Sequence, residues 1–535
     1  MNRKPKHRTM NTNRIFLVLF AALGLVLNGW GQTVTKAGII YTATSENTAS
    51  VTGVSNRLVG TKTIESQVGI SGKSCRVNAI SFQAFAGQKY LRSLTLPAQL
   101  DSIGNEAFIG CSFLQELKGL TDVRHVGDYA FIGTALTEID MSGWAVKSMG
   151  HGVFSGCTQL TQAKLPVVLK TLPPRTFSKC AALGQTNLSE LTALKEIGEG
   201  AFAGCSSMTS ITLPQSVTAL QPFAFEGMTS LAAIELPKAL AGIGDFAFRG
   251  CTALSELVLP DGLTDLGLSP FYGCNALQSV TLSARLKNIS EHYVFDHCPA
   301  LESISIPVQN TLYTSVEGVL YNRTKSQIIA WPAGLSRRIH PVLPASATPL
   351  ARGALMDCEL DEQVWLPARM NTLSYDALTR TSGMKGLAAA QGSLLATIEP
   401  RAVNYCPDLQ VIDLPATVRQ IGEAAFEGCS AVRDILTKSS MPPTIHYTSF
   451  SEDMFAGACL HVRTGSRSVY RMQSLWGHFS NIVDDALTTD IPALPAEDGE
   501  GIVYDLSGRR IREGSALGSP LQKGVYIIRG RKVVK

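Results

Sequence analysis

The histidines, cysteines and acidic residues are the side chains best suited to chemistry, and their spacing assembles no familiar catalytic motif. The chain has nine histidines and twelve cysteines, but no G-x-x-x-x-G-K-[ST], H-E-x-x-H, C-x-x-C or G-x-S-x-G pattern. The densest metal-ligand group is His292, His297 and Cys298. A zinc site would need a further ligand. We therefore interpret Cys298 as a core residue and the two histidines as edge residues, and we predict no metal.

Paired carboxylates give no stronger signal for acid–base catalysis. Glu423 and Glu427 flank Phe426, but the equivalent positions of other repeats hold residues such as Glu226 and Arg249. Positions that accept either charge are typical of a solvent-exposed edge. The 47 glycines are spread through turns and do not form a phosphate-binding loop. We therefore predict no catalytic residue and no cofactor, and we expect that the protein is not an enzyme.

A pentapeptide that returns about every 23 residues organises the chain. It reads Ala107-Phe108-Ile109-Gly110-Cys111 in its first complete copy and Ala425-Phe426-Glu427-Gly428-Cys429 in its last. A fixed period in the twenties indicates a solenoid in which each repeat forms one coil. The phenylalanine position falls at Phe85, Phe108, Phe131, Phe154, Phe177, Phe202, Phe225, Phe248, Phe271 and Phe295, and it resumes at Leu355, Leu378, Val403 and Phe426.

Each repeat also carries the pattern of a short strand. In Leu231-x-x-Ile234-x-Leu236-Pro237 the apolar residues alternate with residues that point outward, and the proline ends the strand. A second apolar pair follows at Leu240 and Ile243. A single coil cannot bury its apolar face alone, so the coils must stack into a continuous core. We predict an α/β to mainly β solenoid.

The cysteines follow the same period. Ten of the twelve lie three residues after the phenylalanine position, and we expect them to form a ladder of free, buried thiols. Cys75 and Cys459 lie outside this ladder and should not pair with each other. The ladder residues are Cys111, Cys157, Cys180, Cys205, Cys251, Cys274, Cys298, Cys358, Cys406 and Cys429.

The outward strand positions are where a ligand-binding surface is expected, because repeat proteins bind through extended faces. They are mixed, small and polar, and about 15 coils at ~4.8 Å would make a face on the order of 70 Å long. A face of that length suits a macromolecule better than a small molecule, although it is also what a merely soluble surface would show. The candidate stripe is Thr95, Lys118, Asp140, Lys164, Asn187, Thr212, Glu235, Val258, Thr281 and Ser305.

Residues 1–31 have the order of a secretory signal peptide, a basic segment, an apolar run of 13 residues and small residues at the end. We predict cleavage after Gly31 and no membrane span thereafter. The whole chain has a net charge of +4, but without this segment it has 42 basic and 43 acidic residues. With no clustered basic face, we expect no nucleic-acid partner.

The pattern divides the chain into eight parts. We predict a signal peptide at 1–31, an N-terminal β cap at 32–75, a solenoid at 76–305, an irregular repeat with a hairpin insertion at 306–345, further repeats at 346–458, a strand–helix cap at 459–484, a linker at 485–500 and a short β tail at 501–535. In the insertion, Ser315–Tyr321 and Gln327–Pro332 are expected to form two strands.

The repeat pattern L-x-x-I-x-L-P-x-x-L-x-x-I-G-x-x-A-F-x-G-C resembles the BspA-like leucine-rich repeats of Bacteroidota surface proteins. The tail, with Val503-Tyr504-Asp505 and Gly524-Val525-Tyr526-Ile527, resembles the last strands of a type IX secretion sorting domain. The resemblance implies a secreted or surface-displayed adhesion protein, outside the outer membrane. It also implies fibronectin, fibrinogen or other bacteria as partners. We expect a monomer.

Two other functions remain open from the sequence. A glycan-binding protein would need clustered exposed aromatic residues, for which Trp144, Trp331 and Trp365 are dispersed candidates. A purely structural protein of the cell envelope would need no ligand at all.

Overall fold

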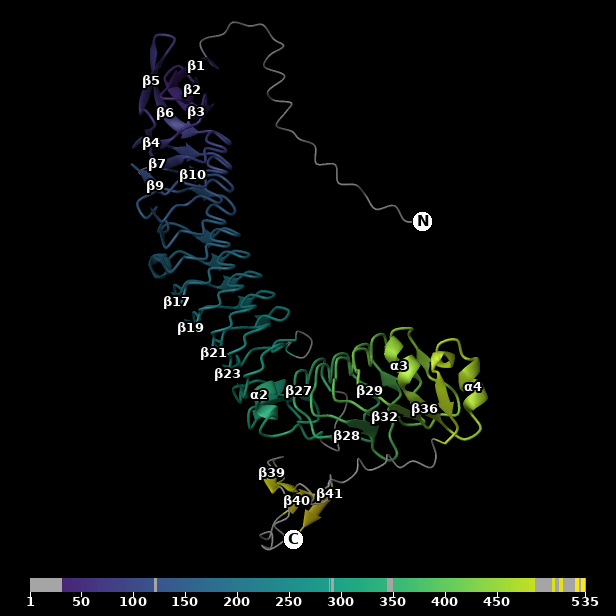
Figure 1. Ribbon diagram of the computed structural model, residues 1–535. Helices are drawn as coiled ribbons and strands as arrows, with labels where there is room; N and C mark the ends of the chain where they lie inside the picture. The colour runs from purple at the N-terminus through teal and green to yellow at the C-terminus, as the bar shows by residue number, and fades with distance from the viewer. Residues whose placement is uncertain are drawn as a thin grey trace. The chain divides into compact units, whose positions relative to one another are not determined.

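The computed structural model describes residues 31–119, 123–287, 289, 293–343 and 350–485, and the backbone of four strands after residue 502. The chain forms two compact units, with residues 135–143 and everything from residue 150 onward in the second. Each unit is a stretch of β-solenoid with few helices (Figure 1). The predicted solenoid is confirmed. The predicted signal peptide and linker lie outside the described residues, apart from Gly31 at the end of the one and residue 485 at the start of the other.

The first unit begins with a mixed sheet and continues into parallel coils. One sheet follows the order β1-β2-β3-β6-β8-β10-β12, with β5 paired to β6, and the other follows the order β4-β7-β9. The strands are β1 (Thr33–Lys36), β2 (Ile39–Ala43), β3 (Thr48–Val54), β4 (Gly60–Thr63), β5 (Gln67–Ile70), β6 (Lys73–Ile80), β7 (Leu91–Thr95), β8 (Ser102–Ile103), β9 (Glu116–Lys118), β10 (His125–Val126) and β12 (Ser148–Met149).

The second unit repeats two short parallel strands per coil. The first strands of the coils are β11 (Glu138–Asp140), β13 (Gln162–Lys164), β15 (Gln185–Thr186), β17 (Ser210–Thr212), β19 (Ala233–Glu235), β21 (Glu256–Val258), β23 (Ser279–Thr281) and β24 (Ser303–Ser305). The second strands form a five-stranded sheet of β14 (Thr171–Leu172), β16 (Glu196–Ile197), β18 (Ala219–Leu220), β20 (Gly242–Ile243) and β22 (Asp265–Leu266).

The phenylalanine of each repeat lies in the core. Within the first unit the rings of Phe85 and Phe108 stack at 5.1 Å, and within the second those of Phe248 and Phe271 lie 5.9 Å apart. These side chains are fully buried, and each contributes about 1.5–3 kcal/mol from its removal from water. Each ring therefore joins its coil to the next, which explains why the residue recurs.

The turn around each phenylalanine requires left-handed backbone on both sides. In the coil of Phe248, Phe246 has φ 54° and Gly250 has φ 70°. Glycine adopts this conformation at little cost, whereas other residues lose about 1–2 kcal/mol. Gly244 is required for a different reason, because a Cβ there would lie 2.5 Å from the Pro222 nitrogen of the preceding coil.

The insertion differs from its prediction. The segment expected to be one strand, residues 315–321, turns at Glu317 and Gly318, which have φ 50° and 85°. It therefore contributes to two strands of a three-stranded antiparallel sheet. The elements are β25 (Tyr313–Val316), β26 (Val319–Asn322), β27 (Ile328–Ala330) and the short helix α2 (Ala333–Ser336).

After the insertion, the coils resume with longer strands. The six-stranded sheet consists of β28 (Gln363–Leu366), β30 (Gly386–Ala389), β32 (Val411–Leu414), β34 (Asp434–Thr437), β36 (Cys459–Val462) and β37 (Asn481–Val483). The opposite sheet consists of β29 (Thr372–Leu373), β31 (Thr397–Ile398), β33 (Gln420–Ile421) and β35 (Thr444–Ile445).

The remaining elements are short. The helices are η1 (Leu188–Glu190), α3 (Glu452–Gly457), α4 (Arg467–Met472) and η3 (Trp476–His478). The tail forms an antiparallel sheet in the order β39-β38-β40-β41, from β38 (Val503–Asp505), β39 (Arg510–Arg512), β40 (Val525–Ile528) and β41 (Arg531–Val534). Among the described residues, none of the helices combines the length and the apolar character that a membrane crossing requires.

Candidate binding surface and polar clusters

The ten ladder cysteines and Cys75 are buried and form no disulfide. Cys459 also forms no disulfide and is half-buried. The ladder thiols do more than fill space, because S–H groups of the ladder donate hydrogen bonds to carbonyl groups of the preceding coil. Cys111 Sγ lies 3.1 Å from the Phe85 oxygen and Cys180 Sγ lies 3.0 Å from that of Phe154. These carbonyls also accept a backbone N–H bond within their own turn, from Gln88 and Cys157, so the thiol adds a second donor that joins one coil to the next.

Burial makes these thiols poor nucleophiles. It raises the pKa of Cys111, Cys205 and Cys274 to about 12. The thiolate is the reactive form of cysteine, so these three thiols stay protonated and inert near neutral pH. Cys406 differs, because hydrogen bonds from Cys429 and Thr381 lower its pKa against the effect of burial. The structure gives the ladder thiols a structural role.

The candidate stripe is exposed over most of its length. In the first unit, Thr95 pairs in register with Lys118. In the second unit, Asp140 pairs with Lys164, Thr212 with Glu235, and Val258 with Thr281 and then Ser305. Thr95, Thr281 and Ser305 are half-buried, and the side chains exposed to solvent are Lys118, Asp140, Lys164, Thr212, Glu235 and Val258.

Asn187 is the exception, and its prediction as an outward residue is wrong. Only 7% of Asn187 is exposed. Its carboxamide accepts from the Leu165 nitrogen at 2.7 Å and donates to the Leu165 oxygen at 3.0 Å. It lies directly before η1, where the coil departs from the regular strand and the phenylalanine spacing lengthens to 25 residues. The side chain thus replaces the backbone pairing that the strand loses.

The equivalent face of the β28–β37 sheet is largely closed. The outward positions in register there include Ala388, Asp413 and Leu436, which are 1%, 6% and 2% exposed. Asp413 forms an ion pair with Lys438 at 2.8 Å. The exposed strand face therefore belongs to the coils before the insertion.

The tryptophans do not form an aromatic surface. Trp144 and Trp331 are buried, and Trp365 is 53% exposed. Of the three candidates for glycan stacking, one is thus accessible.

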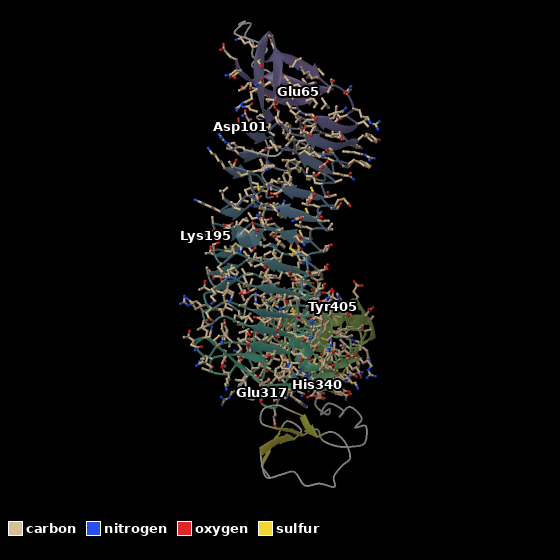
Figure 2. The ribbon with its side chains drawn as sticks, turned by 90° about the vertical axis from the view of Figure 1, so that its left-hand side faces the viewer. Glu65, Asp101, Lys195, Glu317, His340 and Tyr405 are labelled. Atoms are coloured by element: carbon tan, nitrogen blue, oxygen red, sulfur yellow. The ribbon has the colours of Figure 1, made fainter. Side chains whose placement is uncertain are left out.

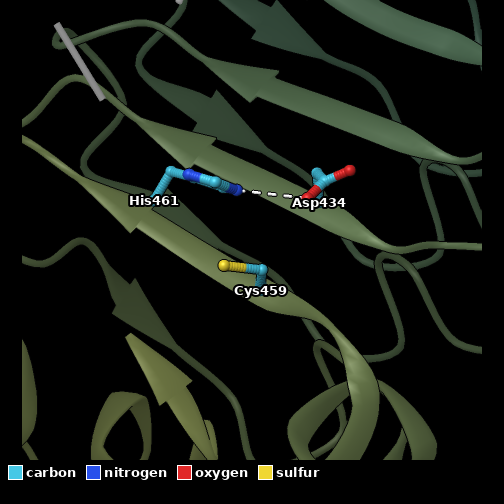
Figure 3. Close-up of side chains that lie close together, drawn as sticks. All are labelled: Asp434, Cys459 and His461. Atoms are coloured by element: carbon cyan, nitrogen blue, oxygen red, sulfur yellow. Dashed lines mark hydrogen bonds and ion pairs between the residues drawn. The ribbon is translucent and has the colours of Figure 1, made fainter. Parts of the chain in front are cut away.

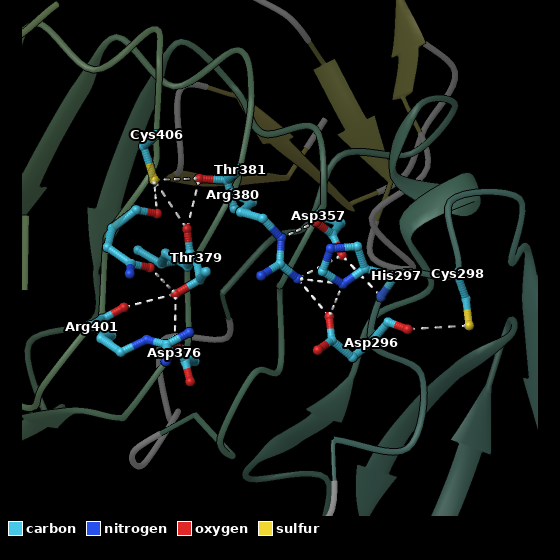
Figure 4. A network of polar contacts seen from close by, with 12 residues as sticks. Asp296, His297, Cys298, Asp357, Asp376, Thr379, Arg380, Thr381, Arg401 and Cys406 are labelled. Carbon is cyan, nitrogen blue, oxygen red and sulfur yellow. Dashed lines mark hydrogen bonds and ion pairs between the residues drawn. The ribbon is translucent and has the colours of Figure 1, made fainter. Parts of the chain in front are cut away.

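The first polar cluster, which we call the Arg380 cluster, consists of Asp296, His297, Asp357 and Arg380 (Figure 4). The guanidinium donates to Asp357 Oδ1 at 2.7 Å and to Asp296 Oδ1 at 2.5 Å. Asp296 also bonds His297 Nδ1 at 2.6 Å. The side chains are 15–26% exposed for Asp296, Asp357 and Arg380. The two carboxylates therefore share one cation of the chain itself.

The Arg380 cluster occupies the glycine position of the repeat. His297, Asp357, Arg380 and Tyr405 have φ of 55°, 61°, 56° and 53°, where other coils have glycine. These four non-glycine residues, each on a different coil, accept the left-handed strain. Tyr405 lies at the surface (Figure 2), and its ring covers Gly428 of the next coil. The ion pairs join the coil before the insertion to the two coils after it, and this is the role that the geometry supports.

A second ion pair, with a buried carboxylate, lies beside this cluster. Asp376 bonds Arg401 Nε at 3.0 Å and is 5% exposed in its side chain. Burial raises the pKa of this carboxyl, against the opposing effect of Arg401. The adjacent pocket, lined by residues including Tyr293 and Trp331, has a volume of about 40 Å³. A space of this size holds a few water molecules at most, so it offers no substrate site.

Of the sequence group His292, His297 and Cys298, the two described residues do not form a common site. His292 lies outside the described residues. The imidazole of His297 joins the Arg380 cluster, whereas Cys298 Sγ is buried and bonds the Phe271 oxygen at 3.2 Å.

The second polar cluster, which we call the Cys459 cluster, consists of Asp434, Cys459 and His461, which Figure 3 shows, together with Asp485. His461 Nε2 lies 3.1 Å from Asp434 Oδ1, and its Nδ1 lies 2.8 Å from Asp485 Oδ1. Ligand atoms of Asp434, Cys459 and His461 all lie within 4.8 Å of one another. Burial, and then the Asp434 and Asp485 carboxylates, raise the pKa of the Cys459 thiol. This arrangement is the opposite of an activated nucleophile.

The sequence holds a signal for the Cys459 cluster. Cys459 and His461 are two residues apart, so on a strand they share a face. Asp434 lies directly opposite Cys459 in the paired strand β34. Its position follows from the repeat register once β36 is recognised as a further coil.

The chain is similar to several solved structures. A leucine-rich repeat protein from Bacteroides ovatus ATCC 8483 aligns with a TM-score of 0.53 and 23% identity, over 75% of this chain and 94% of that one. A leucine-rich cell surface protein from Faecalibacterium prausnitzii A2-165 aligns with a TM-score of 0.35 and 19% identity, over 84% and 94%. The pneumococcal vaccine antigen PcpA aligns with a TM-score of 0.33 and 15% identity, over 86% and 100%.

None of the curated proteins compared with the chain matches it. The BspA type leucine rich repeat region matches in six copies, over residues 78–196, 195–325 and 342–474. These ranges span well over half of the chain and include both sides of the insertion. The chain therefore belongs to the BspA-type leucine-rich repeat family.

Proposed function

We propose that the protein is an exported, non-catalytic adhesion or interaction protein that binds macromolecular ligands through the strand face of the second unit, formed by β11, β13, β15, β17, β19, β21, β23 and β24. The observation that carries this proposal is the contrast in exposure between the two strand faces. Side chains such as Lys164, Glu235 and Val258 are exposed before the insertion, whereas Ala388 and Leu436 are buried after it. Leucine-rich repeat proteins generally serve as scaffolds for protein interaction.

The chemistry of the exposed face favours an extended protein ligand. Charges of both signs lie next to one another, as in the Lys164–Asp140 pair at 3.1 Å. The same face also carries small side chains and the exposed Val258. Such a face offers distributed polar contacts with a small apolar centre. By family resemblance, the proposed ligands are matrix or plasma proteins such as fibronectin and fibrinogen, or the surfaces of other bacteria.

A double charge reversal tests the binding face. We would measure binding of the purified protein to immobilised fibronectin, fibrinogen and bacterial cells, and compare it with the variant K164E/E235K. The matched control is K195E/D265K, which makes the same changes on the exposed edge of the opposite sheet (Figure 2 for Lys195). At least tenfold weaker binding of the first variant, with the control unchanged, is expected. Equal loss in both variants would contradict the assignment to this face, and saturable binding to none of the panel would favour a purely structural protein.

The export route is part of the proposal. Residues 1–31 have the order of a signal peptide, and the four-stranded tail sheet supports a surface-sorting module of the type IX kind. Deletion of residues 501–535 should abolish display on the cell surface while leaving the solenoid folded. Unchanged display, measured by protease accessibility on intact cells, would contradict the sorting role.

A further inference from the structure

The side chains of the Cys459 cluster are brought together by the register of three parallel strands. Asp434, Cys459 and Asn481 lie directly opposite one another on β34, β36 and β37. His461 follows Cys459 by two residues, and two-residue spacing places side chains on the same face of a strand. The positions of the ligand atoms are therefore set by the backbone pairing of the sheet and not by a flexible loop.

We propose that Asp434, Cys459 and His461 bind a divalent transition-metal ion of the Zn²⁺ type. Thiolate, imidazole and carboxylate are the ligands that Zn²⁺ takes in proteins, whereas Ca²⁺ and Mg²⁺ prefer oxygen alone. Three protein ligands would leave one tetrahedral position for water or for a group of a bound partner.

The distances fit this ion. Two ligands at 2.0–2.1 Å from a tetrahedral centre lie roughly 3.3 Å apart. His461 Nε2 and Asp434 Oδ1 are 3.1 Å apart, and the three ligand atoms lie within 4.8 Å of one another. Small side-chain rotations, with no movement of the strands, would bring all three to bonding distance.

The surrounding hydrogen bonds prepare two of the ligands. Asp485 Oδ1 lies 2.8 Å from His461 Nδ1, and a carboxylate there favours the tautomer that leaves the Nε2 lone pair free for a metal. The Asn481 amide donates to Cys459 Sγ at 3.2 Å, which fixes the position of the sulfur. The cluster thus has the outer shell that metal sites in proteins normally have.

The charge of the cluster favours a cation. Within the described part of the chain, neither arginine nor lysine forms an ion pair with Asp434. In the Arg380 cluster, by contrast, the guanidinium already lies between the two carboxylates. The competing explanation is that His461 is itself protonated and serves as the cation between Asp434 and Asp485, in which case the cluster binds no metal.

Titration of the purified, metal-stripped full chain with Co²⁺ under reducing conditions separates these explanations. We expect one Co²⁺ per chain, with the d–d bands of a tetrahedral ion and a thiolate-to-cobalt charge-transfer band, both removed by stoichiometric Zn²⁺. The ladder thiols are buried and hold bonds to carbonyl groups, so the charge-transfer band reports Cys459. Absence of that band in the wild-type chain would overturn the proposal.

Four variants assign the ligands. C459S should remove the charge-transfer band, and H461Q and D434N should each weaken Co²⁺ binding at least tenfold. D485N should keep the band and weaken binding by about 10- to 100-fold, as loss of an outer-shell carboxylate does. H340Q is the matched control, because His340 also bonds a carboxylate, Asp361 Oδ1 at 2.7 Å, without a neighbouring thiol.

A folding control keeps the result decisive. Far-ultraviolet circular dichroism and the thermal midpoint of each variant, measured without metal, should match those of the wild type, because the cluster lies at the surface of the sheet. A variant that unfolds is replaced by C459A or H461N, and the binding comparison is made on those. Wild-type affinity in folded C459S and H461Q would contradict the assignment.

Discussion

The Arg380 cluster and the Cys459 cluster use nearly the same side chains for different ends. Each has two carboxylates near one imidazole: in the first only Asp296 bonds the His297 ring, at 2.6 Å, whereas in the second Asp485 and Asp434 bond the two ring nitrogens of His461 at 2.8 and 3.1 Å. The first is completed by a guanidinium and the second by a thiol. A cation supplied by the chain closes the first cluster and links coils across the insertion, whereas the second presents negative charge and soft donors to solvent. Side-chain type alone therefore does not decide between a structural and a binding role.

The backbone positions of the two clusters differ as well. The Arg380 cluster lies in the turn column, where non-glycine residues accept φ near 55–60°. The Cys459 cluster lies on unstrained strands of the six-stranded sheet. The strain in the first must be offset by its ion pairs, so its members depend strongly on one another. The members of the second carry no such cost.

The largest expected contrast is in thiol reactivity. In the native protein a thiol reagent should modify Cys459 and spare the ladder, because the ladder thiols are buried and burial raises the pKa of Cys111 to about 12. Labelling of the ladder requires local unfolding and should be slower by on the order of 1,000-fold or more. Mass spectrometry of peptides after timed labelling measures both rates. Prompt modification of several ladder cysteines would contradict the structural role assigned to them.

The next effect concerns the cation of the first cluster. R380M leaves Asp296 and Asp357 facing each other without a counter-charge, at 15% and 20% side-chain exposure. Breaking such a partly buried arrangement should cost about 3 kcal/mol, read as a shift in the urea midpoint. R249M is the matched control, because Arg249 pairs with Glu226 at the exposed turn edge, 3.4 Å away. Its cost should be below about 1 kcal/mol, and equal costs would refute the special role of Arg380.

A third experiment attempts to convert one cluster into the other. R380G removes the guanidinium and restores the glycine that most coils have at this position. Asp296, His297 and Asp357 then remain with their ligand atoms within 4.8 Å of one another. We expect R380G to gain a second Co²⁺ site, at least tenfold tighter than any binding by the wild type there, and without a thiolate band. Failure to gain the site in a folded R380G protein would show that charge is not what separates the two clusters.

The repeat predicted the core because the core is where the sequence is most constrained. Phe248 and Cys251 have to fill the same space in every coil, so their period is visible in the sequence. The donation of the thiol proton to a carbonyl was not predicted, since it depends on how far each coil is offset from the last. The turn at Glu317 was missed for a similar reason, because alternating apolar residues continue through it.

The polar clusters were harder to predict because their members come from different coils. Asp296 and Arg380 are 84 residues apart, and the insertion between them hides the register that brings them together. The prediction for Asn187 was wrong because this coil has two additional residues. The alternation of outward and inward residues does not reveal where they are inserted. Once the register is known, Cys459, His461 and Asp434 follow from period-two spacing on neighbouring strands.

The smallest expected effect is the loss of the Asp434 carboxylate in the absence of metal. Asp434 is 42% exposed in its side chain and bonds His461 alone among the ion pairs described. An exposed pair of this kind contributes less than about 1 kcal/mol, so D434N without metal should unfold within that margin of the wild type. With saturating Zn²⁺ the wild type should gain stability and D434N should gain far less, because a ligand that binds only the folded state stabilises it in proportion to its affinity. Urea midpoints with and without Zn²⁺ measure both differences. An equal gain in the two proteins would place the metal elsewhere, and a large loss without metal would give Asp434 the structural role that belongs to Arg380 in the other cluster.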